Sequence, residues 1–78
     1  MNIAKTNPAL PIGLDIKKTI QVRYKNWQGE TAIRTIIPMG IEWGSTEWHA
    51  KEQWLLNVWD VDRNAHRQYA LCDIVEFL

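Results

Sequence analysis

The sequence predicts a mainly β domain, a small five-stranded antiparallel barrel that follows an irregular N-terminal arm. Three observations support this fold class: short segments in which apolar and polar residues alternate, turns containing Gly, Asn or Asp between them, and no convincing long helix. At 78 residues the chain is one domain, and five Trp, two Tyr and one Phe supply the dense core that such a small domain needs. We expect the arm to span residues 1–16 and the barrel residues 17–78.

The N-terminal arm contains Pro8 and Pro11, each of which pushes the preceding residue toward extended backbone. A short helical turn near Gly13 is the alternative. The arm holds neither a long apolar run nor a cleavage-like small-residue site, so we expect neither a signal peptide nor a membrane span. The single cysteine, Cys72, excludes an intramolecular disulfide, and the expected location is the cytoplasm.

The first two strands follow the arm. In KKTIQVRYK, Ile20, Val22 and Tyr24 alternate with polar residues, which indicates a half-buried strand. The turn NWQG ends at Gly29, whose backbone adopts positive φ at little cost. The segment ETAIRTIIP alternates again, and we expect it to end at Pro38 because proline lacks a donor for the strand ladder. MGIEW is then a short third strand, followed by the polar loop GSTEWHAKE.

The segment EQWLLNVWD is predicted to be the next strand. Its alternation places Trp54, Leu56 and Val58 on one face, and Leu55 and Trp59 on the other. A helix would also group several of these residues, but valine and two tryptophans close to turn residues favour a strand. We expect the wholly apolar first face to be the core and the mixed second face to be an exposed contact surface.

The turn DVDRNAH, in which Asn64 can adopt positive φ, precedes the last predicted strand or strand pair, RQYALCDIVEF. Asp60, Asp62 and Asn64 alternate as in a calcium loop, but Ala65 replaces the required glycine and Leu71 stands where a bidentate Glu should close the site. The turn is therefore interpreted as a solvated hairpin without a metal.

The remaining chemistry-bearing residues do not assemble into a known catalytic pattern. His49, His66 and Cys72 lack the spacing of a zinc site. Ser45 lies in a polar loop, and nothing in the sequence places a base and an orienting carboxylate around it. We expect no enzyme activity, no cofactor and no metal.

Charge is balanced, with nine basic and nine acidic residues, so binding to nucleic acid would need a local basic patch. Arg23, Tyr24, Arg34, Arg67 and Tyr69 all fall on predicted strands. Arginines beside aromatic rings bind nucleotides and single-stranded nucleic acid. The alternative is that these arginines are outward positions of alternating strands.

Three segments taken in order, VRYKNWQGETAIRTIIPMGI, EQWLLNVWD and AHRQYALCDI, resemble a WYL domain. The matching residues are Tyr24 of an apolar-x-Tyr strand, Gly29 of its turn, Arg34 and Pro38 of Arg-x-x-x-Pro, Trp54 and Leu56 of the Trp-Tyr-Leu motif, and Arg67 and Tyr69 of Arg-x-aromatic. The resemblance covers residues 17–74. It implies an Sm-like or SH3-like β-barrel and a ligand-sensing or nucleic-acid-binding regulatory module, of the kind attached to DNA-binding domains in bacterial transcription regulators.

Three positions depart from the family pattern. Leu55 stands where the family has its Tyr, Asp73 where an Arg is expected before Ile74, and Ala70 where a basic residue is often found. The carboxylate of Asp73 would repel an anion that a guanidinium would pair with, so these changes weaken an anion site of the family type.

The sequence thus supports two hypotheses of different classes. The first is a stand-alone, non-enzymatic binding or regulatory module of WYL type for a nucleotide or single-stranded nucleic acid, whose ligand-binding residues are Arg34, Trp54, Leu55, Trp59, Arg67 and Tyr69. The second is a protein-interaction adaptor, in which an exposed Trp face docks a protein partner or a second copy of the chain. On the second hypothesis, Trp59→Ala converts an oligomer into a monomer.

Overall fold

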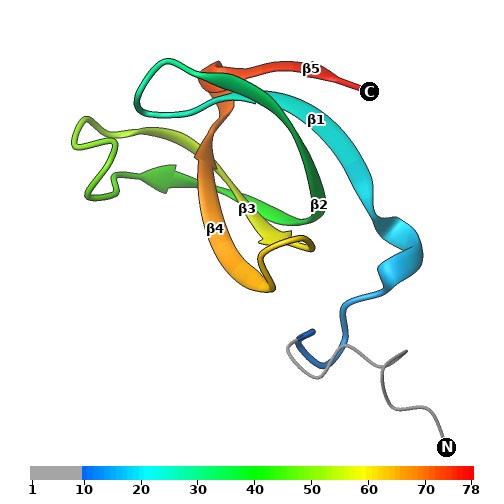
Figure 1. Ribbon diagram of the computed structural model, residues 1–78. Coiled ribbons are helices and arrows are strands. Elements are labelled where there is room, and N and C mark those ends of the chain that lie inside the picture. The colour runs from blue at the N-terminus through cyan, green and yellow to red at the C-terminus, as the bar shows by residue number, and fades with distance from the viewer. Residues whose placement is uncertain (1–9) are drawn as a thin grey trace, which may run out of the picture.

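The computed structural model describes residues 10–78, which contain a five-stranded antiparallel sheet, so the mainly β fold is confirmed. The strands are β1 (Ile20–Lys25), β2 (Thr31–Gly44), β3 (Gln53–Asp60), β4 (Ala65–Ala70) and β5 (Ile74–Phe77), with the short 3-10 helices η2 (Ile16–Lys18) and η3 (Leu71–Asp73). Their order in the sheet is β4-β3-β2-β1-β5, and the sheet is curled (Figure 1). No helix within the described part of the chain is long and apolar enough to cross a membrane.

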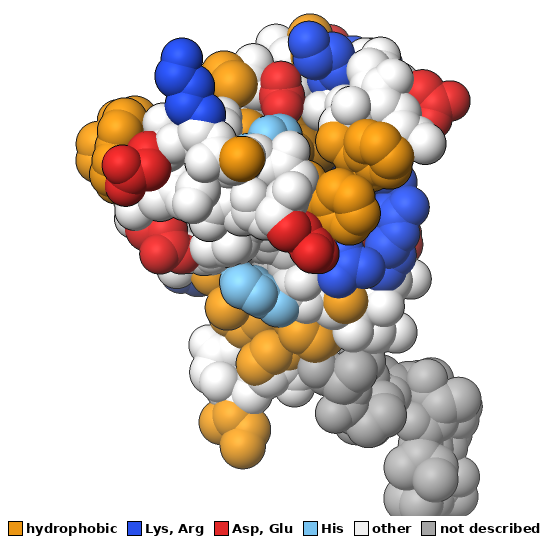
Figure 2. Space-filling view, turned by 90° about the vertical axis from the view of Figure 1, so that its left-hand side faces the viewer, with side chains coloured by type: hydrophobic (Ala, Val, Ile, Leu, Met, Phe, Trp, Pro, Cys, Tyr) orange, Lys and Arg blue, Asp and Glu red, His pale blue; other side chains and the backbone are white. Residues whose placement is uncertain are grey.

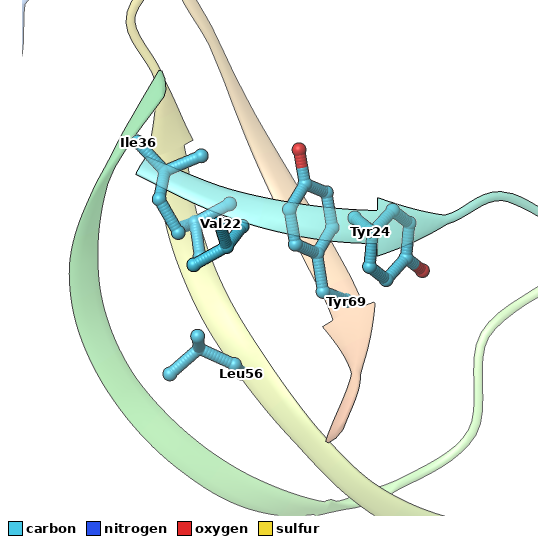
Figure 3. Packing of buried hydrophobic residues seen from close by; sticks show 6 residues of the cluster. Val22, Tyr24, Ile36, Leu56 and Tyr69 are labelled. Carbon is cyan, nitrogen blue, oxygen red and sulfur yellow. The ribbon is translucent and has the colours of Figure 1, made fainter. Parts of the chain in front are cut away.

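The curl of the sheet brings β4 close to β1, although β3 and β2 lie between them in the strand order. The rings of Tyr24 on β1 and Tyr69 on β4 stack with their centroids 3.9 Å apart and an interplanar angle of 13°. Behind these rings, Val22, Ile36 and Leu56 fill the interior of the curl together with Val58 (Figure 3). We call the face that carries these side chains the concave face of the sheet.

Strand β2 is longer than the sequence predicts, because it does not end at Pro38 and MGIEW is not a separate strand. The first part of β2 pairs with β1, and the part from Ile36 to Gly44 pairs with β3. A β-bulge separates the two parts between Pro38 and Gly40, and Gly40 takes a φ of 148° there. Proline is tolerated at bulges, where the regular ladder is already interrupted, so Pro38 bends the strand instead of ending it.

Strand β3 has the two faces that the alternation predicts, but the depth of burial of Trp54 differs from the prediction. Leu56 lies opposite Tyr69 in the register, so Trp54, Leu56 and Val58 share the concave face. Leu56 and Val58 are buried, whereas Trp54 is 54% exposed. Because β4 ends opposite Leu55, Trp54 has a strand neighbour on the β2 side only, and placing it in the core was wrong.

The opposite face of β3 is buried where the sequence analysis expects exposure. Leu55 is 1% exposed and Trp59 is 8% exposed. Leu55 lies opposite Ala70, the last residue of β4, and η3 then packs against β3. Trp59 lies opposite the buried Ile37 of β2. The expected exposed contact surface around Leu55 and Trp59 is therefore part of the protein interior.

The turns agree with their sequence signals. Gly29 has a φ of 84° in the turn between β1 and β2, and Asn64 has a φ of 51° in the turn between β3 and β4. Near the expected arm boundary, the Asp15 side chain accepts a hydrogen bond from the backbone N–H of Lys17 and caps η2. Residues 1–9 of the predicted arm lie outside the described residues.

Candidate functional site

A cavity of about 400 Å³ opens at the concave face of the sheet. All four strands from β1 to β4 contribute to its lining, together with the β1–β2 turn, the β2–β3 loop and the β3–β4 turn. Its lining residues are Tyr24, Asn26, Trp27, Arg34, Trp48, His49, Asp60, Arg63, Arg67, Gln68 and Tyr69. Figure 2 shows the side of the molecule toward which the β1–β2 turn and the β2–β3 loop point. Hydrophobic side chains lie beside basic ones on this side.

Three of the six residues predicted to bind a ligand line this cavity: Arg34, Arg67 and Tyr69. The other three do not. Trp54 is exposed near the far end of the β2–β3 hairpin, and Leu55 and Trp59 are buried on the opposite face of β3. The cavity therefore brings together the two predicted arginines and Tyr69. The tryptophans in its lining are Trp27 and Trp48 instead of the predicted Trp54 and Trp59.

The register of the strands explains why the two arginines meet. Arg34 of β2 lies opposite Val22, and Arg67 of β4 lies opposite Val58. Val22 and Val58 are fully buried on the concave face, and directly opposed residues of an antiparallel pair share a face. The alternative that the arginines are outward positions is thus wrong for Arg34 and Arg67, whereas Arg23 lies outside the cavity lining and is paired with Glu76. The curl then brings β2 and β4 around one cavity.

The three cavity arginines differ in their partners. Arg63 is neutralised, because its Nη1 lies 3.1 Å from Oδ2 of the buried Asp60 and its backbone N–H donates to Oδ1 of the same carboxylate. Arg67 Nη1 donates to the carbonyl oxygen of His66. Arg34 is only partly exposed, and no hydrogen bond or ion pair from residues 10–78 holds its guanidinium. Positive charge without a carboxylate partner therefore faces the cavity.

The stacked tyrosines of the cavity are neutral at physiological pH. Burial, together with the charge of Asp60 and against a lowering by Arg34, raises the pKa of Tyr69 to about 12. Burial also raises the pKa of Tyr24, against a smaller lowering by a backbone hydrogen bond with Ala70. Both side chains therefore offer an aromatic ring and an uncharged hydroxyl rather than a second negative charge.

Two lining residues that the sequence analysis did not assign to the site are Trp27 and Trp48. Trp27 belongs to the β1–β2 turn and Trp48 to the β2–β3 loop, yet their rings stack with centroids 5.2 Å apart and an interplanar angle of 20°. Each is an aromatic residue inside an otherwise polar loop, and this is the signal by which they can be found in the sequence. Their proximity depends on the curl of the sheet.

Asp73, which stands where the resembled family has an Arg, is not among the lining residues. One of its carboxylate oxygens lies 4.0 Å from Nζ of Lys25, and the other lies 4.0 Å from Nε2 of His49. The carboxylate therefore adjoins two potential cations beside the cavity. No group of three or more His, Cys, Asp or Glu residues suited to a metal ion occurs in the described part of the chain.

No family model, curated protein or solved structure matches this chain.

Proposed function

We propose that the chain is a non-enzymatic binding module whose cavity holds a nucleotide or a segment of single-stranded nucleic acid. The observation that carries this proposal is the guanidinium of Arg34, which is partly buried and has no hydrogen-bond or ion-pair partner among residues 10–78, in a cavity that also contains stacked aromatic rings. A guanidinium removed from part of its water and given no carboxylate gains most from an anionic ligand, because charge-assisted hydrogen bonds are the strong ones.

The aromatic side chains of the cavity indicate that the ligand contains a planar ring in addition to an anionic group. Trp27 and Trp48 present exposed ring faces at the cavity, and base–aromatic stacking is the usual way in which proteins bind unpaired nucleotides. A nucleotide combines an anionic phosphate with a planar ring. The volume of about 400 Å³ lies within the range of cavities that bind small organic ligands.

The charge distribution supports the same ligand class. The whole chain is neutral, so no long-range field attracts nucleic acid, and binding depends on the local pair Arg34 and Arg67. The single carboxylate of the lining, Asp60, is engaged by Arg63. A regulatory module that binds such a ligand also agrees with what the resemblance to WYL domains implies.

Arg34→Gln is expected to weaken binding of a short oligothymidylate roughly 10-fold or more, since one charge-assisted hydrogen bond is lost. The slope of log affinity against log salt concentration should become shallower by about 0.7, as expected for one lost phosphate contact on a single strand. Fluorescence anisotropy with an end-labelled oligonucleotide at several salt concentrations measures both quantities.

Arg23→Gln is the matched control for this experiment. Arg23 carries the same charge on the neighbouring strand β1, but it is paired with Glu76 at 2.9 Å and lies outside the cavity lining. Its replacement should change the affinity about twofold or less, because an exposed ion pair contributes little. If the native protein binds neither nucleoside monophosphates nor oligothymidylate at low ionic strength, the proposed function is wrong.

A second candidate function, self-association, is favoured by the projecting end of the β2–β3 hairpin. Ile41, Trp43 and Trp54 are each more than half exposed there, and the rings of Trp43 and Trp54 meet edge to face at 5.3 Å. We infer a second copy of the chain as the partner of this surface, because a chain of zero net charge does not repel its own copy. Trp59, expected earlier to lie in such an interface, is buried instead.

Trp43→Ser is expected to convert a dimer into a monomer, because it removes the central ring of the exposed apolar surface on the hairpin. Sedimentation velocity at high micromolar concentration measures the change. Ile33→Ser is the control, since Ile33 is similarly exposed but lies on the other part of β2, opposite Arg23. A native protein that is monomeric at the same concentration rules out self-association.

A further inference from the structure

Trp27 and Trp48 are an unusual pair because both are exposed and yet stacked on each other. Trp27 is 61% exposed and Trp48 is 59% exposed. They come from two different loops, which lie next to each other on one side of the sheet (Figure 1). Both rings border the cavity that contains Arg34 and Arg67. The pair therefore stands at the edge of the proposed ligand site.

Each of the two loops is held by its own internal hydrogen bonds. In the β1–β2 turn, Oδ1 of Asn26 accepts from the backbone N–H groups of Gln28 and Glu30. In the β2–β3 loop, Oγ1 of Thr46 accepts from the backbone N–H groups of Trp48 and His49. Each tryptophan is thus carried by a loop with hydrogen bonds of its own, which do not depend on the other loop.

The ring stack is the interaction that joins the two segments. Within residues 10–78, no hydrogen bond or ion pair connects the β1–β2 turn to the β2–β3 loop. Among the residues that the structure describes, one contact between potentially charged side chains joins the β2–β3 loop to another element, between Nε2 of His49 and Oδ2 of Asp73 at 4.0 Å. Separating Trp27 from Trp48 therefore breaks one ring contact and leaves the hydrogen bonds of both loops intact.

The two indoles of the observed stack must move apart to hold a third ring between them. Two aromatic rings with a planar ligand between them have centroids about 7 Å apart, because each pair of stacked atoms lies about 3.5 Å apart. The centroids of Trp27 and Trp48 are 5.2 Å apart. The two indoles must therefore separate by at least about 2 Å, and by about 3.5 Å from an offset stack in contact, before a planar ring contacts an indole on both of its faces.

We propose that Trp27 and Trp48 form a clamp that opens to take one unpaired nucleobase between the two indole rings, while the phosphate of the same nucleotide lies at Arg34 and Arg67. This inference rests on the proposed function and specifies its ligand as a nucleotide with a base free on both faces. A free nucleotide and a single strand both provide such a base, whereas a base stacked inside a duplex does not.

The test compares the variants Trp27→Leu and Trp48→Leu with Phe77→Leu. Phe77 is an aromatic residue as exposed as Trp27, but it lies on β5 outside the cavity lining. The ligands are adenosine monophosphate, a single-stranded oligoadenylate, and the same oligoadenylate annealed to its complement. Far-ultraviolet circular dichroism of each variant confirms that the fold is retained, since all three side chains are mostly exposed.

Each clamp variant is expected to weaken binding of the monophosphate and of the single strand roughly 5- to 100-fold, the range found for the loss of one base–aromatic stack. The double variant should be weaker than either single variant, because each indole stacks on its own face of the base. Phe77→Leu should change the affinity less than twofold, and the duplex should bind at least tenfold more weakly than the single strand, as a rough expectation. Ligand addition should also reduce the exciton signal of the stacked indoles.

Two results separate the clamp from the proposed function. If the single strand binds and Arg34→Gln weakens it, but both tryptophan variants bind like the native protein, then the clamp is wrong and the binding function stands. Equal affinity for the duplex and the single strand also overturns the clamp. If the native protein binds none of the three ligands, the proposed function fails and the clamp fails with it.

Discussion

Replacing Leu55 with alanine is expected to lower the free energy of unfolding by about 2–5 kcal/mol, the range for truncation of a buried leucine. Leu55 is almost completely buried on β3, opposite Ala70 of β4, so the variant loses apolar contacts and leaves a space that the neighbouring strands fill only in part. Denaturant unfolding at low protein concentration, followed by circular dichroism, measures this change. A domain of this size is marginally stable, so Leu55→Val, with an expected loss of about 1 kcal/mol, provides a milder variant.

Trp54→Ala is the control for this prediction. Side-chain size alone indicates a larger loss of stability for Trp54→Ala than for Leu55→Ala, and we expect the opposite. The indole of Trp54 is much larger than the side chain of Leu55, but more than half of it is exposed and its ring partner is the exposed Trp43. We expect Trp54→Ala to change the free energy of unfolding by about 1 kcal/mol or less. A loss from Trp54→Ala that exceeds the loss from Leu55→Ala would falsify the burial pattern described for β3.

Raising the pH from about 10 to about 12 is expected to lower the free energy of unfolding by up to about 2–3 kcal/mol through Tyr69 alone. Burial raises the pKa of Tyr69 from 10.0 in the unfolded chain to about 12 in the folded protein. Below pH 10 both states keep the proton, so the stability is unaffected. Above pH 10 the unfolded chain loses the proton first, and each further pH unit favours unfolding until the folded state also ionises.

Tyr69→Phe separates this effect from the titration of other groups. The variant keeps the ring that stacks on Tyr24 but has no ionisable hydroxyl, so its stability should fall less between pH 10 and 12 than that of the native protein. Tyrosinate absorbance during an alkaline titration provides the second measurement. Two tyrosines that both ionise near pH 10 in the folded protein would contradict the buried stack.

The alternation of residues in β1 and β3 is sufficient to predict both strands and the face on which each side chain lies. The register confirms that Trp54, Leu56 and Val58 share one face, and that Leu55 and Trp59 share the other. Turn chemistry is equally local, and both Gly29 and Asn64 take the positive φ that their positions indicate. These features depend on interactions between residues close together in the chain.

The depth of burial does not follow from alternation, and the errors at Trp54, Leu55 and Trp59 have this common cause. A face of a strand is buried only where another element covers it. One element that packs against β3 is η3, which becomes a neighbour only after the chain has passed through β4. At Trp54 the strand β4 has already ended, so the same apolar face that forms the core at Leu56 is open at the hairpin end.

In the candidate site too, some residues could be selected from the local sequence and others only from the tertiary structure. The sequence analysis selects Arg34, Arg67 and Tyr69 from the types of residue on the predicted strands, and these three line the cavity. It does not select Trp27 and Trp48, because they lie 21 positions apart in two loops and nothing local indicates that they stack. Their contact is a consequence of the bend in β2 and the curl of the sheet.

The sequence by itself determined the positions of β1 and β3, the two faces of β3 and the turns at Gly29 and Asn64, because side-chain alternation and backbone preferences act over a few residues. Only the tertiary structure decided which faces are covered, that β2 continues through Pro38, and that two arginines and two ring pairs surround one cavity. These properties depend on pairings between segments distant in sequence. A curl that brings β4 against β1 is set by the sheet as a whole rather than by any one strand.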